Sequence, residues 1–158
     1  MRAALVFVLA LSACATALPD QSPMGLVPDS GGLQPAGSDL RIDFSRAEAG
    51  AIDTVSRLLG ARPARIVDQA DCGAGPLRAV RWPTGLTLNF QDGDFVGWVV
   101  DAPGARVAGG YRVGMAAPDL ALQQTSLGRE FEDGGIYGLI EGAGTITTLW
   151  SGTTCFYR

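Results

Sequence analysis

The hydrophobic pattern around residue 50 is helical. Apolar side chains recur on one helix face at Ala51, Ile52, Val55, Leu58 and Leu59. Ser45 and Glu48 have the spacing of a capping box, in which each side chain satisfies a backbone amide of the other. Gly60 and Pro63 follow in the order typical of a helix end. The pattern predicts one amphipathic helix beginning near Ser45.

Alternating residues further along predict a β-hairpin. Residues 86–90 alternate apolar and polar side chains, and Asp92-Gly93 is a strong signal for a two-residue turn. A strand over Leu77–Trp82 precedes this hairpin. The turn predicts the cross-strand pairs Phe90–Phe95, Leu88–Gly97, Leu86–Val99 and Thr87–Trp98. This register places the apolar pairs on one face and Thr87 with Trp98 on the other.

A second hairpin is predicted from residues 136–141 and 145–151, around Gly142-Ala143-Gly144. It allows one shared face for Ile136, Ile140, Ile146 and Trp150. A short helix is predicted over residues 117–127, with Pro118 in its first turn. These elements predict an α+β fold with helices packed on one face of an antiparallel sheet, arranged as two helix–meander units.

The first residues have the parts of an export signal. Arg2 precedes a short apolar stretch that is too short to span a bilayer. Residues 11–14, Leu-Ser-Ala-Cys, resemble the bacterial lipobox, which implies a signal peptide over residues 1–13 and a lipid-bearing Cys14 with fatty acyl (palmitate) chains. Cleavage after Ala17 is the alternative, and it would release a soluble periplasmic or secreted protein.

Residues 14–38 are rich in proline and glycine and show no hydrophobic period, so we expect a lipidated linker there. Residues 39–158 are then a single globular domain. In Gram-negative bacteria the absence of aspartate after Cys14 resembles the pattern of outer-membrane lipoproteins. We therefore expect a location in the cell envelope, on the periplasmic face of the outer membrane.

Composition excludes several functions. All twelve basic residues are arginines, set against sixteen acidic residues, and no basic run occurs, which disfavours nucleic-acid binding. The chain has no lysine, which excludes Schiff-base chemistry and a P-loop. It also has no histidine, which excludes Ser-His-Asp, Cys-His and zinc-hydrolase mechanisms. We expect no cofactor and no metal.

The three cysteines fall into two groups, Cys14 in the lipobox and the other two in the globular domain. If Cys14 carries lipid, Cys72 and Cys155 remain as an even pair in an oxidising compartment. A disulfide between them would stabilise the fold by roughly 4 to 5 kcal/mol in the chain-entropy model. Free thiols are the alternative.

Three groups of side chains are candidate sites. Asp92 and Asp94 are interpreted as solvated turn residues. Acidic residues at 130, 132 and 133 lack the oxygen spacing of a calcium loop and are interpreted as a solvated loop. Arg78, Trp82 and Trp98 form a possible partner-binding patch if they project from the non-core face, with core burial of both tryptophans as the alternative.

Two resemblances bear on the class of protein. Arg112-Val-Gly-Met and the following segment resemble a motif of SmpA/OmlA-type envelope lipoproteins, with a departure at Ala116, and of β-lactamase-inhibitor modules, which bind proteins. Cys72-Gly73, Gly97-Trp98 and Thr154-Cys155 resemble a family of small, uncharacterised exported bacterial proteins. Some members of that family carry the name aspartate-semialdehyde dehydrogenase, an activity that needs a nucleotide-binding glycine loop and a histidine base. This chain has neither.

These observations predict a non-catalytic envelope lipoprotein that binds another envelope protein or has a structural role. Two alternatives remain open. A carboxylate-based glycan hydrolase needs no histidine but requires two acids facing each other across a cleft. A carrier of a small apolar ligand requires an unfilled cavity between sheet and helices.

Overall fold

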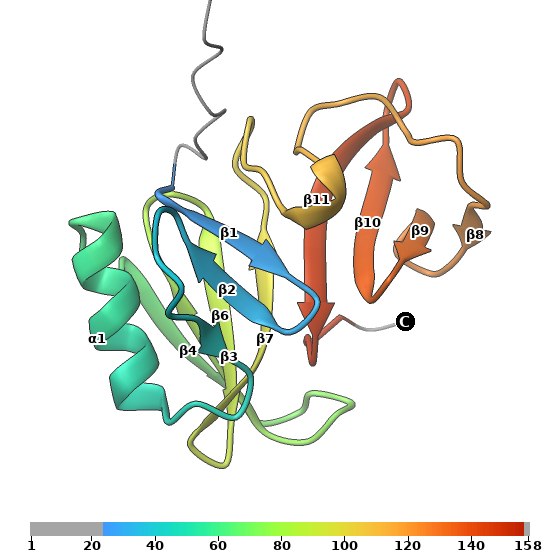
Figure 1. The fold of residues 1–158 in the computed structure, drawn as a ribbon. Coiled ribbons are helices and arrows are strands. Elements are labelled where there is room, and N and C mark those ends of the chain that lie inside the picture. The colour runs from blue at the N-terminus through green and yellow to red at the C-terminus, as the bar shows by residue number, and fades with distance from the viewer. Residues whose placement is uncertain (1–23, 157–158) are drawn as a thin grey trace, which may run out of the picture.

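The computed structural model describes residues 24–156, which form one α-helix, a single turn of 3-10 helix and two antiparallel sheets (Figure 1). The predicted signal peptide and Cys14 lie outside these residues. The elements are β1 (Leu26–Asp29), β2 (Gly32–Pro35), β3 (Ile42–Asp43), α1 (Glu48–Leu59), β4 (Arg65–Gln69), β5 (Leu77–Arg81), β6 (Leu86–Gln91), β7 (Asp94–Val100), η1 (Ala108–Gly110), β8 (Gln123–Gln124), β9 (Arg129–Asp133), β10 (Ile136–Glu141) and β11 (Thr145–Gly152).

The predicted α+β class is wrong, because the fold is mostly β. Residues 117–127 form no helix and contain only the short strand β8. The preceding segment pairs with β11 instead. The amide of Gly114 donates to the carbonyl of Ile146, and the amide of Ile146 donates to the carbonyl of Met115. The amide of Ala117 donates to the carbonyl of Gly144. This pairing holds the chain extended up to the proposed helix start, so no second helix–meander unit forms.

The folded unit also begins earlier than predicted. Part of the expected linker forms the hairpin β1–β2, which pairs with β3 in the three-stranded sheet. Leu26 and Leu33 of this hairpin are fully buried. Leu26 and Leu33 occur among prolines and glycines, so the composition of the segment conceals two core positions.

The eight-stranded sheet consists of two four-stranded meanders joined edge to edge. Its strand order is β4-β5-β6-β7-β11-β10-β9-β8. The meanders meet where β7 and β11 pair antiparallel, from Leu149 opposite Val100 to Gly152 opposite Gly97. In Figure 1 the β1–β3 sheet crosses in front of the first meander, and α1 lies at the side of β4.

The helix prediction is confirmed, whereas the capping box is not. Helix α1 ends at Gly60, whose left-handed φ of 60° lets its amide bond back to the helix. At the start, Ala47 is the cap and makes no side-chain hydrogen bond. The amide of Glu48 instead donates to the carbonyl of Gly93, at 2.8 Å. The first turn of the helix is therefore anchored to the β6–β7 turn.

Both predicted hairpins are confirmed, but a β-bulge changes the register of each. In the first, Phe90 pairs with Phe95 and the next pair is Asn89 with Gly97, so Val96 is the extra residue. Beyond the bulge Leu88 pairs with Trp98, which moves that tryptophan to the core face. The predicted pairing of Thr87 with Trp98 is wrong.

The second bulge moves a tryptophan away from the core face, whereas the first bulge moves one onto it. Ile140 pairs with Ile146, and Leu139 pairs with Thr148, so one extra residue separates the two pairs. Trp150 consequently pairs with Tyr137 and leaves the face of Ile140 and Ile146. The predicted shared face of Trp150 with the three isoleucines is therefore wrong.

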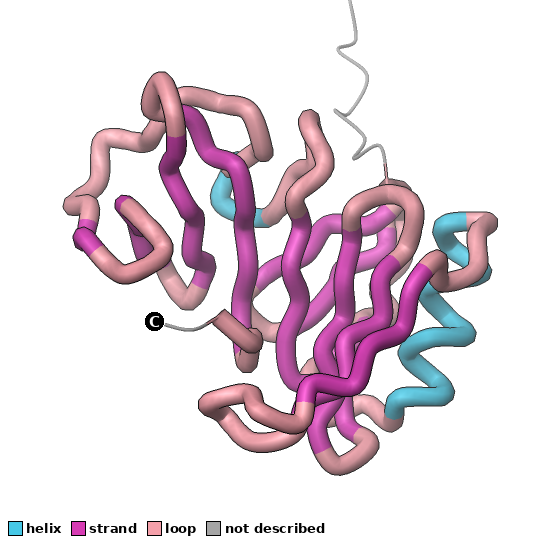
Figure 2. Tube along the Cα trace, turned by 180° about the vertical axis from the view of Figure 1, so that it is seen from behind, coloured by secondary structure: helices cyan, strands magenta, loops and turns pink. Residues whose placement is uncertain are grey.

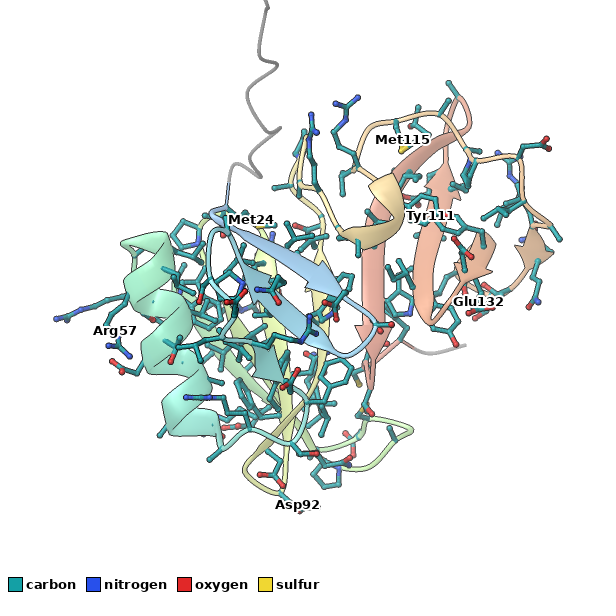
Figure 3. All side chains as sticks on the ribbon, viewed as in Figure 1. Met24, Arg57, Asp92, Tyr111, Met115 and Glu132 are labelled. Carbon is teal, nitrogen blue, oxygen red and sulfur yellow. The ribbon has the colours of Figure 1, made fainter. Side chains whose placement is uncertain are left out.

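One hydrophobic core fills the space between the eight-stranded sheet and the layer that covers it. This covering layer consists of α1 and the three-stranded sheet β1–β3. The largest side chains of the core include Trp82, Trp98, Phe90 and Phe95, all almost completely buried. The cluster continues into the second meander, where the ring of Tyr111 packs on Phe131 at 4.9 Å between centroids. Figure 3 labels Tyr111 beside the strands of this meander. The two meanders thus share one core.

Candidate functional site

The predicted partner-binding patch does not form an exposed surface. Trp82 and Trp98 are both 0% exposed. The indole of Trp82 donates to the hydroxyl of Ser56 on α1, and that of Trp98 donates to the carbonyl of Asp29 on β1. Both tryptophans lie beneath the covering layer and hold it to the sheet.

Arg78 is the third member of the predicted patch, and it is partly exposed beside α1. Its Nε lies 3.1 Å from Glu48, and its Nη1 lies 3.5 Å from Asp68. Arg78 therefore joins the helix and the edge strand β4 to β5. The alternative of core burial holds for the two tryptophans.

The opposite side of the eight-stranded sheet, here called the outer face, presents a continuous row of side chains. Within the described residues no helix or strand covers it, and Figure 2 views the molecule from that side. Register partners follow one another across five strands, in the order Thr87, Val99, Trp150, Tyr137 and Glu132. The row runs from a polar side chain through two aromatic rings to a carboxylate.

An aromatic hollow of about 380 Å³ lies on this row beside Trp150. Trp150 is itself almost completely buried, because the ring of Tyr137 stacks on it at 5.8 Å and Phe156 meets it edge-on at 5.0 Å. The turn residues Gly73 and Ala74 line the hollow together with Phe156. The hollow therefore has one wall before β5 and one wall after β11.

An acidic hollow of about 430 Å³ lies on the other side of Tyr137. Glu130 and Glu132 project into it from alternate positions of β9, so both are on the outer face. Glu130 is only 5% exposed, and the hydroxyl of Thr125 donates to its Oε1 at 2.6 Å. Glu132 is exposed and accepts the amide of Gly135 at 2.8 Å.

The two hollows share Tyr137, which places an aromatic ring beside the carboxylates of the acidic hollow. Trp150 occupies one face of the tyrosine ring, so the other face is turned toward β9 and Glu132. The described residues that line the acidic hollow include two carboxylates and no arginine. A carboxylate pair beside an aromatic face is the arrangement that attracts an organic cation.

Sequence reasoning missed this site because it interpreted the acidic residues as a solvated loop. Residues 129–133 are instead the strand β9, which turns through Gly134-Gly135 into β10. A signal was present, because a Gly-Gly pair between Phe131 and Ile136 is a hairpin turn signal. The burial of Glu130 depends on strand β8 and Thr125, which the pattern did not indicate.

The structure places Cys72 and Cys155 side by side at the edge of the aromatic hollow. Both are free thiols, with Cys72 buried and Cys155 half-buried. Burial raises the pKa of the Cys155 thiol to about 11, and a hydrogen bond with Cys72 adds to the shift. The predicted disulfide remains a prediction, now with its partners in contact.

No family model, curated protein or solved structure matches the chain. The two resemblances noted in the sequence therefore stay predictions. Within residues 24–156, no helix has both the length and the apolar character needed to cross a bilayer.

Proposed function

We propose that the protein is a non-catalytic binding protein of the cell envelope, and that its outer face captures a cationic side chain of another envelope protein. The observation that carries this proposal is that Glu130, Glu132 and the aromatic ring of Tyr137 line one hollow on the outer face. An arginine or lysine of the partner would lie against that ring and donate hydrogen bonds to the carboxylates.

The excess of acidic residues supports a basic partner. Removal of a signal peptide would take Arg2 away and leave eleven arginines against sixteen acidic residues. The resulting field attracts positively charged segments over several ångströms and favours their association. Export and lipidation at Cys14 belong to the same proposal and rest on the lipobox resemblance. A Cys14→Ser variant is expected to leave the membrane fraction.

The acidic hollow also bears on the hydrolase alternative. Glycan hydrolysis needs one carboxyl group on each side of the scissile bond. Glu130 and Glu132 lie two residues apart on one strand and project from the same wall. This arrangement favours binding over hydrolysis. A carrier would need an unfilled cavity between the layers. Trp82 and Trp98 fill the space between α1, the three-stranded sheet and the large sheet, which disfavours a carrier.

The test uses a short peptide, capped at both ends, with two arginines separated by glycine. Its control peptide carries citrulline, which has nearly the shape of arginine without the charge. Binding is measured by calorimetry and by tryptophan fluorescence, since Trp150 lies directly behind Tyr137. We expect the arginine peptide to bind at least about tenfold more tightly than the citrulline peptide.

Matched variants separate the site from general charge attraction. Glu130→Gln with Glu132→Gln should weaken arginine-peptide binding about tenfold or more, and Tyr137→Ala should weaken it severalfold. Asp119→Asn removes a charge from an exposed loop position outside the site and should change binding less than twofold. Equal losses in the site and control variants would refute the proposal. Release of sugars from a glycan library would instead support the hydrolase.

A further inference from the structure

Cys72 and Cys155 come from distant parts of the chain and meet beside the outer face. Cys72 lies in the turn between β4 and β5, and Cys155 lies in the segment that follows β11. The sulfur of Cys72 is 4.0 Å from the carbonyl oxygen of Thr154, and the two thiols are hydrogen-bonded to each other. Cys72 is buried and Cys155 is more exposed, so a reagent reaches the pair from the side of Cys155.

The backbone on both sides of this contact is held by hydrogen bonds. The amide of Thr153 donates to the carbonyl of Val96 at 2.8 Å, and the side-chain amide of Asn89 donates to the carbonyl of Thr153 at 3.0 Å. On the other side, the side-chain amide of Gln91 donates to the carbonyl of Ala74 at 2.7 Å. The sheet therefore positions the two cysteines against each other.

We propose that Cys72 and Cys155 are joined by a disulfide in the exported protein, and that this bond clasps residues 153–156 onto the outer face. The segment beyond β11 carries Phe156, whose ring covers Trp150. The turn on the Cys72 side supplies another wall of the aromatic hollow, through Gly73 and Ala74. A bond between the cysteines ties the two walls together, whatever the outer face binds.

The bond forms by thiol–disulfide exchange with an external disulfide. The Cys155 thiol gives its proton to solvent, and its thiolate attacks one sulfur of the oxidant, whose own disulfide breaks. The first oxidant thiolate leaves, and a mixed disulfide remains on Cys155. The Cys72 thiolate then attacks the Cys155 sulfur and releases the second oxidant thiolate. The oxidant gains two electrons, and its thiolates take up the two protons that the cysteines lost.

The pKa of Cys155 sets the pH dependence of this oxidation. Because its pKa is raised to about 11, the thiolate is scarce at neutral pH. We expect the rate of oxidation by oxidised glutathione to rise close to tenfold for each pH unit between about 7 and 9. A model thiol peptide titrates lower, so its rate levels off earlier.

The experiment compares the exported protein with the same protein after reduction by dithiothreitol. Trypsin releases Cys72 in peptide 66–78 and Cys155 in peptide 130–158, because cleavage follows arginine. We expect non-reducing mass spectrometry to find these two peptides linked, lighter than their sum by two hydrogen atoms. Unlinked peptides with free thiols, even after incubation with oxidised glutathione, would overturn the proposal.

The fluorescence of Trp150 tests whether residues 153–156 are held on the outer face, separately from whether the disulfide forms. Trp82 and Trp98 are sealed in the core, so release of residues 153–156 would uncover Trp150 alone. Reduction should raise acrylamide quenching about twofold and lower the Tm by on the order of ten degrees. Cys155→Ser alters a half-buried position and should behave like the reduced protein with or without dithiothreitol. A linked peptide without any change in quenching would overturn the clasp.

Discussion

Tyr111 shows how a single side chain ties the segment after η1 to strand β9 of the second meander. Its hydroxyl donates to Oδ2 of Asp133 at 2.5 Å, and its ring packs on Phe131. Burial of the ring, together with the bond to Asp133, raises the pKa of Tyr111 to about 12 from a usual 10.0. The neutral phenol is therefore the form that the folded protein prefers.

Tyr111 should make the protein less stable in alkali. In the unfolded chain the phenol loses its proton near pH 10, whereas in the folded chain it keeps it to about 12. The unfolded state binds fewer protons over this interval, so the free energy of unfolding falls as the pH rises through it. The measurement is urea unfolding between pH 9 and 12. A Tyr111→Phe variant should lose less stability over this interval than the wild type, and an identical loss would contradict the assignment.

Asp133→Asn tests the cause of the shift. Burial is the largest single cause of the shift and remains in the variant, so the pKa of Tyr111 should fall but stay above 10. The phenolate absorbance of the variant, after subtraction of the Tyr111→Phe spectrum, measures this pKa. A value at or below 10 would show that Asp133, and not burial, dominates.

Single residues of the acidic hollow were harder to predict than its strands. Glu130 and Glu132 alternate with Phe131, which is the pattern of a strand with one buried face. The pattern cannot indicate that Glu130, on the other face, is buried as well. That burial depends on residues 123–125, whose polar sequence resembles a loop, and on the hydroxyl of Thr125 as a donor.

At the scale of elements, the strands and turns were predictable and the bulges were not. Asp92-Gly93 forms the predicted turn, with positive φ at both residues. A period of two carries no mark for an extra residue, so a register without bulges places Trp98 and Trp150 each on the wrong face. Each bulge reverses the direction of every side chain beyond it. The aromatic part of the outer face exists because one bulge moves Trp150 there.

Gly97, next to the first bulge, should tolerate no side chain. A Cβ at this position would lie 2.2 Å from the carbonyl oxygen and 2.7 Å from the amide nitrogen of Thr153, and neither backbone atom is free to rotate away. We expect Gly97→Ala to lower the free energy of unfolding by about 3 kcal/mol, measured by urea denaturation.

Gly73→Ala is the matched control for this substitution. A Cβ at Gly73 meets no atom within 4 Å, and its φ lies outside the left-handed region. The control should therefore stay within about 0.5 kcal/mol of the wild type. Equal stability of the two variants would mean that β11 and β7 are further apart than the structure has them.

At the scale of the whole molecule, the main difference between prediction and structure lies in which segments form the covering layer. The sequence predicts one helix beginning near Ser45 and a second where residues 117–127 carry spaced leucines. The residues just before it, 114–117, pair with β11 and its preceding turn instead, and Leu120 and Leu122 are left exposed. The missing part of the layer comes from the hairpin β1–β2, where proline and glycine composition conceals Leu26 and Leu33. Composition over a window cannot resolve two core residues inside a polar segment.

The shared core predicts that both meanders unfold together. The β7–β11 pairing joins them along four residue pairs, and the hydrophobic cluster runs from Trp98 through Leu149 to Ile140 without a break between the halves. Ile140→Ala empties a core position in the second meander and should cost about 2 to 5 kcal/mol. If the core is one unit, the lower stability must also appear as a lower unfolding midpoint in the fluorescence of Trp82 and Trp98, which lie in the first meander.

The comparison is thermal unfolding followed by tryptophan fluorescence and by far-ultraviolet circular dichroism. Ile140→Ala should lower both midpoints equally, in one transition, because neither meander has a core that is closed without the other. Leu40→Ala, at a side chain that is 80% exposed, should leave both midpoints nearly unchanged. Two separate transitions in the Ile140 variant would mean that β7 and β11 join independent units, and the outer-face row would then cross a flexible junction. A single transition is what the aromatic hollow requires, because its lining residues Gly73 and Ala74 come from the first meander, whereas Trp150 lies on the second and Phe156 follows it.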